Sequence, residues 1–401
     1  MKEFGDVQGT LLDLLGSSLF SRPYTPSPEV DFEAVLRESE LQSVTLIAFR
    51  DVASLPLSED VAVRIRQRLK EHMMGTVQCF RNHGYLHALM EKNGIPYCII
   101  KGAASAQYYA DPLSRNMGDV DFYVPTEHLQ KARAVLLEDG FEEQEQAHGY
   151  HASFFKKGTH LELHFAPIAA PDGELGALFY EYWDGICDRS VLCEGGIVRF
   201  RMTDPFLHGF ILLSHLQSHL LSEGVGLRHV CDWLVFTERF SDEEFLSLFR
   251  DRLKRVGLWR LACLLCLAAS EYLGMPYREW MGEDRQTARA LFEDILRGGN
   301  FGSKDRRRLY EGYFISDNRR TSVKRNRILQ AFSSVNDLVD RYWSLPKRFP
   351  ILYPFGWIYF SLRFFFRRLT GKRKVSVRSA YSESKKRKEL YESLRLLTPE
   401  D

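Results

Sequence analysis

Met117-Gly-Asp-Val-Asp-Phe-Tyr-Val124 determines the predicted fold, because it alternates polar and apolar residues over the length of a strand. Alternate side chains of a strand share one face, so Asp119 and Asp121 point the same way while Val120 packs into the core. Two carboxylates one strand step apart repel each other unless a cation lies between them. We expect Mg²⁺ here, or Mn²⁺ in its place, since Mg²⁺ is usually held by one or two carboxylates together with substrate phosphates.

The segment upstream, Ile99-Ile-Lys-Gly-Ala-Ala-Ser105, predicts a turn from a strand into a helix. A helix that begins after Gly102 directs free backbone N–H groups and the positive end of its dipole toward an anion. Gly102 would let a phosphate approach the backbone, and Ser105 would add a hydroxyl group. Lys101, and Arg115 just before the carboxylates, could reach the same phosphates. An Asp-x-Asp motif by itself is more typical of a turn or a solvated strand face, so the order of these features favours a phosphate site.

A third carboxylate is expected from a neighbouring strand. Glu162, within Leu161-Glu-Leu-His-Phe165, has a suitable context, because it is an acid flanked by apolar residues in a stretch of strand length. It would position or deprotonate an attacking hydroxyl group, while metal ions neutralise charge on the transferred phosphoryl group. Glu143 and Glu145 are alternatives for this role.

The hydrophobic patterns predict an α+β fold, in which a mixed sheet with flanking helices is followed by a mainly helical C-terminal domain. A long helix is expected over 61–92 and strands over 95–100, 120–124, 141–146, 151–157 and 159–165. From Asp204 onward the patterns are almost purely helical. We predict four regions: an N-terminal helical segment 1–60, a catalytic domain 61–200, a helical domain 201–340 and an aromatic and basic segment 341–401.

Composition excludes several classes of protein. The chain of 401 residues is too long for one ordinary core, and its net charge of +1 does not favour a nucleic-acid partner. Seven cysteines, mostly in apolar contexts, indicate reduced thiols rather than a disulfide framework or a zinc knuckle. The N-terminus lacks the basic region of a secretory signal, so we expect a cytoplasmic protein.

Residues 353–374 combine dense aromatic side chains with arginines and lysines. Their apolar run is too short to span a bilayer, which needs about 20 predominantly apolar residues. An amphipathic element of this composition fits a peripheral contact with a membrane, or a partner groove. An aromatic core helix with a solvated basic face is the alternative.

The helical half offers further candidate residues. His215, His219 and Glu223 share one helix face, but the His-Glu-x-x-His signature of a zinc protease is missing. Arg228 could line a cleft facing the sheet and meet a base, a ribose or an acceptor anion. A structural pair between Arg228 and Asp232, one helical turn apart, is an equally good interpretation.

Taken together, these residues resemble the nucleotidyltransferase superfamily of the DNA polymerase β type. The nearest likeness is a bacterial group usually called uncharacterised nucleotidyltransferases. The resemblance covers roughly residues 60–240 and rests on Ile100-Lys-Gly102, Arg115, Asp119-Val-Asp121, and Gly226-Leu-Arg228 with Asp232. The second Gly or Ser of the superfamily turn is replaced by Ala103, so phosphate would be bound less closely or through Lys101.

The resemblance implies a Mg²⁺-dependent transfer of a nucleoside monophosphate from a nucleoside triphosphate, such as ATP, to an acceptor hydroxyl or phosphate. The acceptor, a small molecule, a protein or RNA, is not identified by the sequence. One alternative is a catalytically inactive nucleotide-binding or scaffold protein of a bacterial biosynthetic cluster. Another is a tRNA-modifying toxin, which the Lys-Gly turn and the Arg before the carboxylates also resemble.

Overall fold

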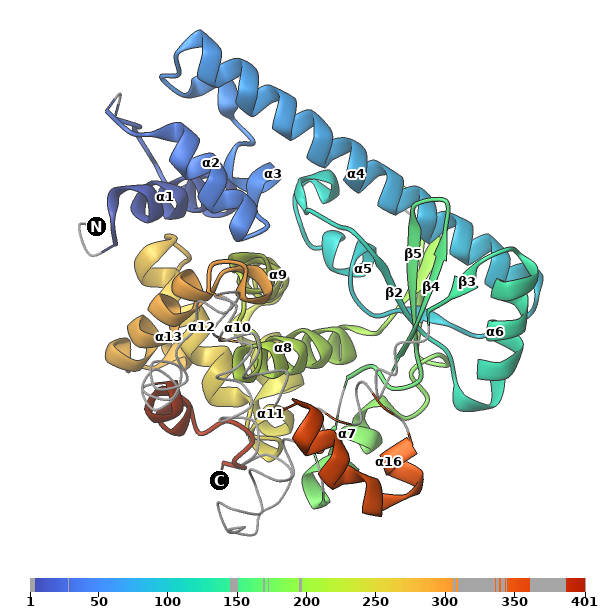
Figure 1. Ribbon diagram of the computed structural model, residues 1–401. Helices are drawn as coiled ribbons and strands as arrows, with labels where there is room; N and C mark the ends of the chain where they lie inside the picture. The colour runs from blue at the N-terminus through green and yellow to red at the C-terminus, as the bar shows by residue number, and fades with distance from the viewer. Residues whose placement is uncertain are drawn as a thin grey trace.

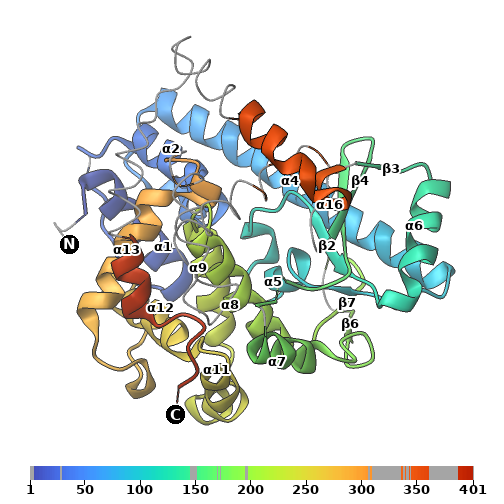
Figure 2. The same cartoon turned by 60° about the horizontal axis from the view of Figure 1, so that its bottom comes forward.

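The computed structural model describes residues 4–27, 29–144, 151–168, 170–171, 173–194, 197–305, 345–360 and 387–400, and the single positions 308, 336, 339 and 343. One half of the molecule is a sheet backed by a long helix, and the other half is helical (Figure 1). The predicted α+β fold is confirmed. Figure 2 shows the same two halves from a second side, with α8 and α9 between the sheet and the other helices.

The strands are β1 (Cys98–Ile99), β2 (Val120–Tyr123), β3 (Glu142–Glu143), β4 (His151–Lys156), β5 (Thr159–His164), β6 (Val191–Cys193) and β7 (Phe200–Met202). The sheet half also contains the helices α4 (Glu59–Lys92), α5 (Ala103–Ala106), α6 (Leu129–Glu138) and α7 (Glu174–Trp183). The helices bounded within the rest of the described chain include α1 (Asp6–Phe20), α2 (Phe32–Leu41), α3 (Thr45–Ala48), α8 (Pro205–Leu221), α9 (Leu227–Thr237), α10 (Asp242–Phe245), α11 (Asp251–Arg255), α12 (Trp259–Tyr272), α13 (Arg285–Gly298) and α16 (Leu345–Arg348).

The seven-stranded sheet has the order β3-β4-β5-β2-β1-β7-β6 and mixes parallel with antiparallel pairs. β2 and β5 are parallel, and their register places Asp121 beside Glu162. β4 and β5 form a hairpin through Lys157 and Gly158, both of which have positive φ (45° and 82°). This is the turn geometry that matches the twist of two antiparallel strands. These two pairings bring the central strands of the candidate site together.

The alternation read from the sequence separates the two faces of the sheet. Val120 and Phe122 of β2 and Leu161 of β5 are fully buried in a core that they share with Phe80 of α4 and Leu136 of α6. The long helix α4 covers this face and ends at Lys92, before Asn93 and Gly94 (φ 58°), as its sequence predicted. The carboxylates of β2 and β5 therefore lie on the opposite face, toward the helical half.

A second core joins the N-terminal helices to helices of the helical half. Leu11 and Leu15 of α1 belong to the same buried cluster as Leu264 of α12 and Leu291 of α13. The N-terminal helices, predicted as a separate segment, thus pack into the core of the helical half. The domain boundaries near residues 60, 200 and 340 stay predictions.

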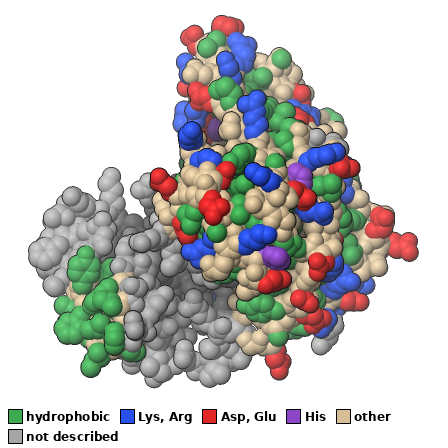
Figure 3. Space-filling view, turned by 90° about the vertical axis from the view of Figure 1, so that its right-hand side faces the viewer, with side chains coloured by type: hydrophobic (Ala, Val, Ile, Leu, Met, Phe, Trp, Pro, Cys, Tyr) green, Lys and Arg blue, Asp and Glu red, His purple; other side chains and the backbone are tan. Residues whose placement is uncertain are grey.

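The face of the molecule seen in Figure 3 is neither uniformly acidic nor uniformly basic. Acidic and basic side chains of the described residues are interspersed on it. Among the residues that the structure describes, none of the helices has both the length and the apolar character needed to cross a membrane. The segment 353–374, for which a membrane contact, a partner groove and an aromatic core helix are the alternatives, lies outside the described residues beyond position 360.

Candidate active site

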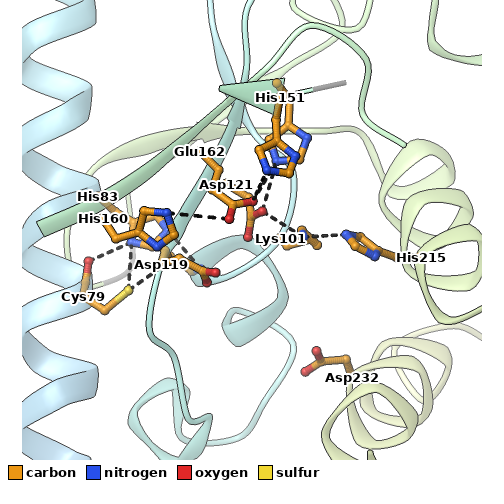
Figure 4. A network of polar contacts seen from close by, with 12 residues as sticks. Cys79, His83, Lys101, Asp119, Asp121, His151, His160, Glu162, His215 and Asp232 are labelled. Carbon is orange, nitrogen blue, oxygen red and sulfur yellow. Dashed lines mark hydrogen bonds and ion pairs between the residues drawn. The ribbon is translucent and has the colours of Figure 1, made fainter. Parts of the chain in front are cut away.

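The carboxylates of the candidate site lie on two neighbouring strands. Asp119 precedes β2, Asp121 is its second residue, and Glu162 is the register partner of Asp121 on β5 (Figure 4). Asp121 is almost fully buried, with 3% of its surface exposed, while Asp119 and Glu162 are half-buried. The structure therefore brings together the three acids that the sequence selected for catalysis.

Lys101 links these carboxylates to the helical half. Its Nζ lies 2.8 Å from Asp121 Oδ1 and 2.5 Å from His215 Nε2 of α8. Burial lowers the pKa of Lys101, but the charges of Asp121 and Asp119 raise it by more, so the amine stays protonated. Burial and the charge of Lys101 hold the pKa of His215 well below its usual range, so its neutral ring accepts from the lysine.

The three carboxylates differ in how well their charges are compensated. Burial raises the pKa of Asp121, yet Lys101 and His164 together hold it well below its usual range. The charge of Asp121, with burial, raises the pKa of Asp119. Burial raises the pKa of Glu162, but His164, Lys101 and His151 together lower it by more. Asp119 is thus the carboxylate whose charge a further cation would stabilise most.

The turn after Lys101 is tighter than the sequence indicated. Gly102 has φ 58°, and a Cβ at this position would lie 3.0 Å from His83 Nε2, so only glycine fits here without strain. The helix that follows, α5, has four residues, and its Ala103 amide donates to His83 Nε2 at 3.4 Å. Ser105 is 1% exposed, and its hydroxyl has no partner among the described residues. Phosphate binding by Gly102 and Ser105 stays a prediction.

Arg115 and Arg228 lie differently from the arrangement considered in the sequence. The guanidinium of Arg115 donates to both oxygens of Asp232, at 2.7 Å each, and Tyr109 Oη donates to the same carboxylate at 2.8 Å. The suggested pair between Arg228 and Asp232 was therefore wrong, because Asp232 pairs with Arg115 of the sheet half. Arg228 instead donates to Asn116 O at 3.5 Å and lies over the ring of Phe301. Phosphate binding by Arg115 stays a prediction.

Three histidines that the sequence analysis missed surround Glu162. His151 Nε2 and His160 Nε2 each lie 3.7 Å from a Glu162 oxygen, and His164 Nε2 lies 3.5 Å from Oε2. His164 also contacts Asp121 Oδ1 at 3.1 Å. The signal was present in His160-Leu-Glu-Leu-His164, whose alternation puts both imidazoles on the face of Glu162.

These donors fit a divalent cation. Asp119, His160 and Glu162 form one group, and His151, Glu162 and His164 form a second. In each group the potential ligand atoms lie within 4.8 Å of one another. Carboxylate oxygens and imidazole nitrogens are ligands that divalent metals use in proteins.

Two other histidines, His83 and His208, are completely buried and belong to neither of these donor groups. Burial lowers the pKa of His83 to about 4 and that of His208 to about 3, so both rings are neutral at pH 7. His208 stacks on Tyr108 at a centroid distance of 5.0 Å, and neither of its nitrogens has a partner among the described residues. Each ring must take up a proton in an apolar environment when the pH falls.

We expect the free energy of unfolding to fall as the pH drops from about 6.5 toward 4, because the unfolded chain binds protons there that the buried rings exclude. The pKa of His208 is lower in the folded protein than in the unfolded chain. Its contribution to the free energy of unfolding is therefore complete above the unfolded pKa and is lost as the pH falls toward the folded pKa. His208→Phe should reduce the fall between pH 7 and pH 5 by about 2 kcal/mol. Urea unfolding at pH 7 and pH 5 measures this, and an unchanged fall in the variant would contradict it.

The fold and the site are those expected of a nucleotidyltransferase, with clustered carboxylates on adjacent strands facing a helical half. Residues 28–274 match the profile of a family described as "Uncharacterised nucleotidyltransferase". The match extends over more than half of the chain, so the protein belongs to this family, and the resemblance to uncharacterised nucleotidyltransferases is confirmed.

Comparison with other proteins adds little to this result. No curated protein matches the chain. One solved structure that is similar is the crystal structure of an antigenic nucleotidyltransferase-like protein from Paracoccidioides brasiliensis. It shares 15% sequence identity and a TM-score of 0.29, over 51% of this chain and 94% of that chain. A similarity this weak supports no further conclusion.

Proposed function

We propose that the protein transfers a nucleoside monophosphate from a nucleoside triphosphate to an acceptor hydroxyl or phosphate, with Mg²⁺ or Mn²⁺ as cofactor. The observation that carries this proposal is the convergence of Asp119, Asp121 and Glu162 beside Lys101. Three acids and one protonated amine suit a reaction in which charge develops on phosphate oxygens and an acceptor group loses a proton.

Each residue has a defined part in this reaction. Asp119 and Asp121 would hold the cation, which neutralises charge on the triphosphate when it is bound. Lys101, held by Asp121, supplies a fixed positive charge to the phosphates. The acceptor oxygen forms a bond to the α-phosphorus as the bond to pyrophosphate breaks, and Glu162 orients the acceptor and takes its proton. Arg228, from the helical half, contacts the base, the ribose or an acceptor anion.

In this proposal Arg115 mainly stabilises the site, and phosphate binding is its secondary role. Its Nε and Nη2 are committed to Asp232, so phosphate could reach its remaining N–H groups without breaking that pair. The pair ties the segment before β2 to α9 and so holds the carboxylates toward the helical half.

The position of the transferred phosphorus distinguishes this reaction from other uses of a nucleotide. Purified protein is incubated with Mg²⁺ or Mn²⁺, a cell extract, and each nucleoside triphosphate labelled at either the α- or the γ-phosphate. We expect the α-label to enter a product, pyrophosphate to be released, and both to be absent with chelator or in Asp119→Asn. Transfer of the γ-label instead would indicate a kinase and refute the proposal.

The same experiment tests the scaffold alternative. Tight binding of a nucleoside triphosphate with no release of pyrophosphate from any of them would identify a nucleotide-binding protein without transferase activity. Product in an RNA fraction of the extract would favour the tRNA-modifying toxin, whereas product in a small-molecule or protein fraction would identify another acceptor.

A further inference from the structure

Glu162 lies at the centre of an imidazole-rich group that nucleotide transfer with Mg²⁺ does not require. His151 comes from β4, and Glu162 and His164 come from β5, so the hairpin between these strands fixes all three. His151 and His164 are directly paired across the hairpin, with ring centroids 5.0 Å apart. Figure 4 shows His151 beside Glu162 and Asp121, above Lys101.

The distances from Glu162 to the two imidazoles are close to those between neighbouring ligands of one ion. Glu162 Oε2 lies 3.7 Å from His151 Nε2 and 3.5 Å from His164 Nε2. Well-formed hydrogen bonds of this kind are shorter, at roughly 2.7–3.2 Å. Two ligands held at about 2.0–2.2 Å from a tetrahedral ion are separated by roughly 3.4 Å. A small shift of these side chains would therefore place the three atoms around one metal ion.

Burial and charge favour occupation of this group. His151 and His164 are 8% and 1% exposed, so both imidazoles lie in a buried setting in which few water molecules would compete for an ion. His164 now contacts Asp121 Oδ1 at 3.1 Å, and its Nε2 would leave this contact to bind an ion. Lys101, at 2.8 Å, would still compensate the charge of Asp121. Glu162 would be compensated by the ion, so both carboxylates would keep a positive partner.

We propose that His151, Glu162 and His164 form a binding site for a first-row transition-metal ion, with Zn²⁺ or Co²⁺ preferred over Mg²⁺. Two nitrogen ligands and one oxygen ligand suit these ions, whereas Mg²⁺ prefers oxygen ligands and retains much of its water. The ion would lie beside the Asp119–Asp121 pair and share Glu162 with it. This site goes beyond the proposed function, which requires neither His151 nor His164, and its failure would leave that function untouched.

Calorimetric titration of the full chain with Zn²⁺ or Co²⁺, in excess Mg²⁺ and without nucleotide, tests the site. We expect one ion to bind per chain, and His151→Gln and His164→Gln each to weaken binding at least about 10-fold. His87→Gln is the matched control, because His87 is a partly buried histidine of the same domain that bonds Tyr97 Oη at 2.8 Å. It should bind the ion as the unaltered protein does.

Further variants separate this site from the neighbouring carboxylates. Zinc binding should persist in Asp119→Asn, since Asp119 belongs to the other group of donors. Loss of binding in Asp119→Asn with full binding in His151→Gln would overturn the assignment, as would displacement of zinc by millimolar Mg²⁺. Urea unfolding of each variant shows whether a loss of binding reflects an unfolded protein, and His151→Gln, at the start of β4, is the variant that decides if His164→Gln does not fold.

Discussion

Asp232→Asn should lower the free energy of unfolding by about 3–5 kcal/mol, the usual cost of removing one partner of a buried ion pair. The substitution keeps the volume of the side chain but leaves the guanidinium of Arg115, which is 4% exposed, without its counter-charge. A guanidinium is not deprotonated in proteins, so Arg115 cannot escape the cost by losing its proton when Asp232 loses its charge. Urea unfolding at pH 7 measures the change.

Two controls identify the uncompensated charge as the cause. Asp242→Asn breaks the more exposed ion pair with Arg278 and should cost no more than about 1 kcal/mol. Arg115→Met combined with Asp232→Leu removes both charges, and it should be more stable than Asp232→Asn alone. The prediction is contradicted if Asp232→Asn loses less than about 1 kcal/mol, or if the double variant is less stable than Asp232→Asn.

The pair also shows why part of the site could not be predicted from the sequence. Arg115 and Asp232 are separated by 117 positions and meet only because α9 packs against the segment before β2. Periodicity within one helix can suggest the pairing of Arg228 with Asp232, but it contains no information about a partner from the other half. Long-range contacts of this kind depend on how the two halves pack.

Features set by local periodicity were predictable. The alternation in Asp119-Val-Asp121 placed the carboxylates on one face and Val120 in the core. Glu162 was selected from its strand context, and the β2–β5 register, which pairs it with Asp121, could not be read from the sequence. The alternation in β5 also placed His160 and His164 on the face of Glu162. The position of His151 could be known only from the register of the hairpin.

For the helix expected after Gly102, in contrast, the local sequence did not determine where the helix ends. Its alanines favour a helix, but α5 ends at Ala106 because the two tyrosines that follow are held by other elements. Tyr108 stacks on His208, and Tyr109 donates to Asp232. A helix of one turn has a small dipole, so the anion site inferred from this turn loses its electrostatic support, and Lys101 becomes the main source of positive charge there.

Asp121→Asn should abolish nucleotidyl transfer, with a loss of at least about 10³-fold in kcat/KM, comparable to the removal of a key electrostatic group from other active sites. The carboxylate would hold the cation, and it also holds Lys101 at 2.8 Å and His164 at 3.1 Å. Its pKa lies well below the usual range, so the native group is charged at any pH suitable for an assay. The amide has a similar shape but lacks the charge that aligns the lysine.

Release of pyrophosphate from the preferred nucleotide, with the α-label followed into product, measures this loss. Asp139→Asn is the matched control, because Asp139 pairs with Lys156 at the edge of the same domain and should retain nearly full activity. Circular dichroism and urea unfolding must show a folded variant, since Lys101 and His164 both lose their buried partner. Activity within tenfold of the unaltered protein, in a folded Asp121→Asn, would remove this carboxylate from the catalytic site. The reaction would then have to depend on Asp119 and Glu162, whose shared neighbour is His160.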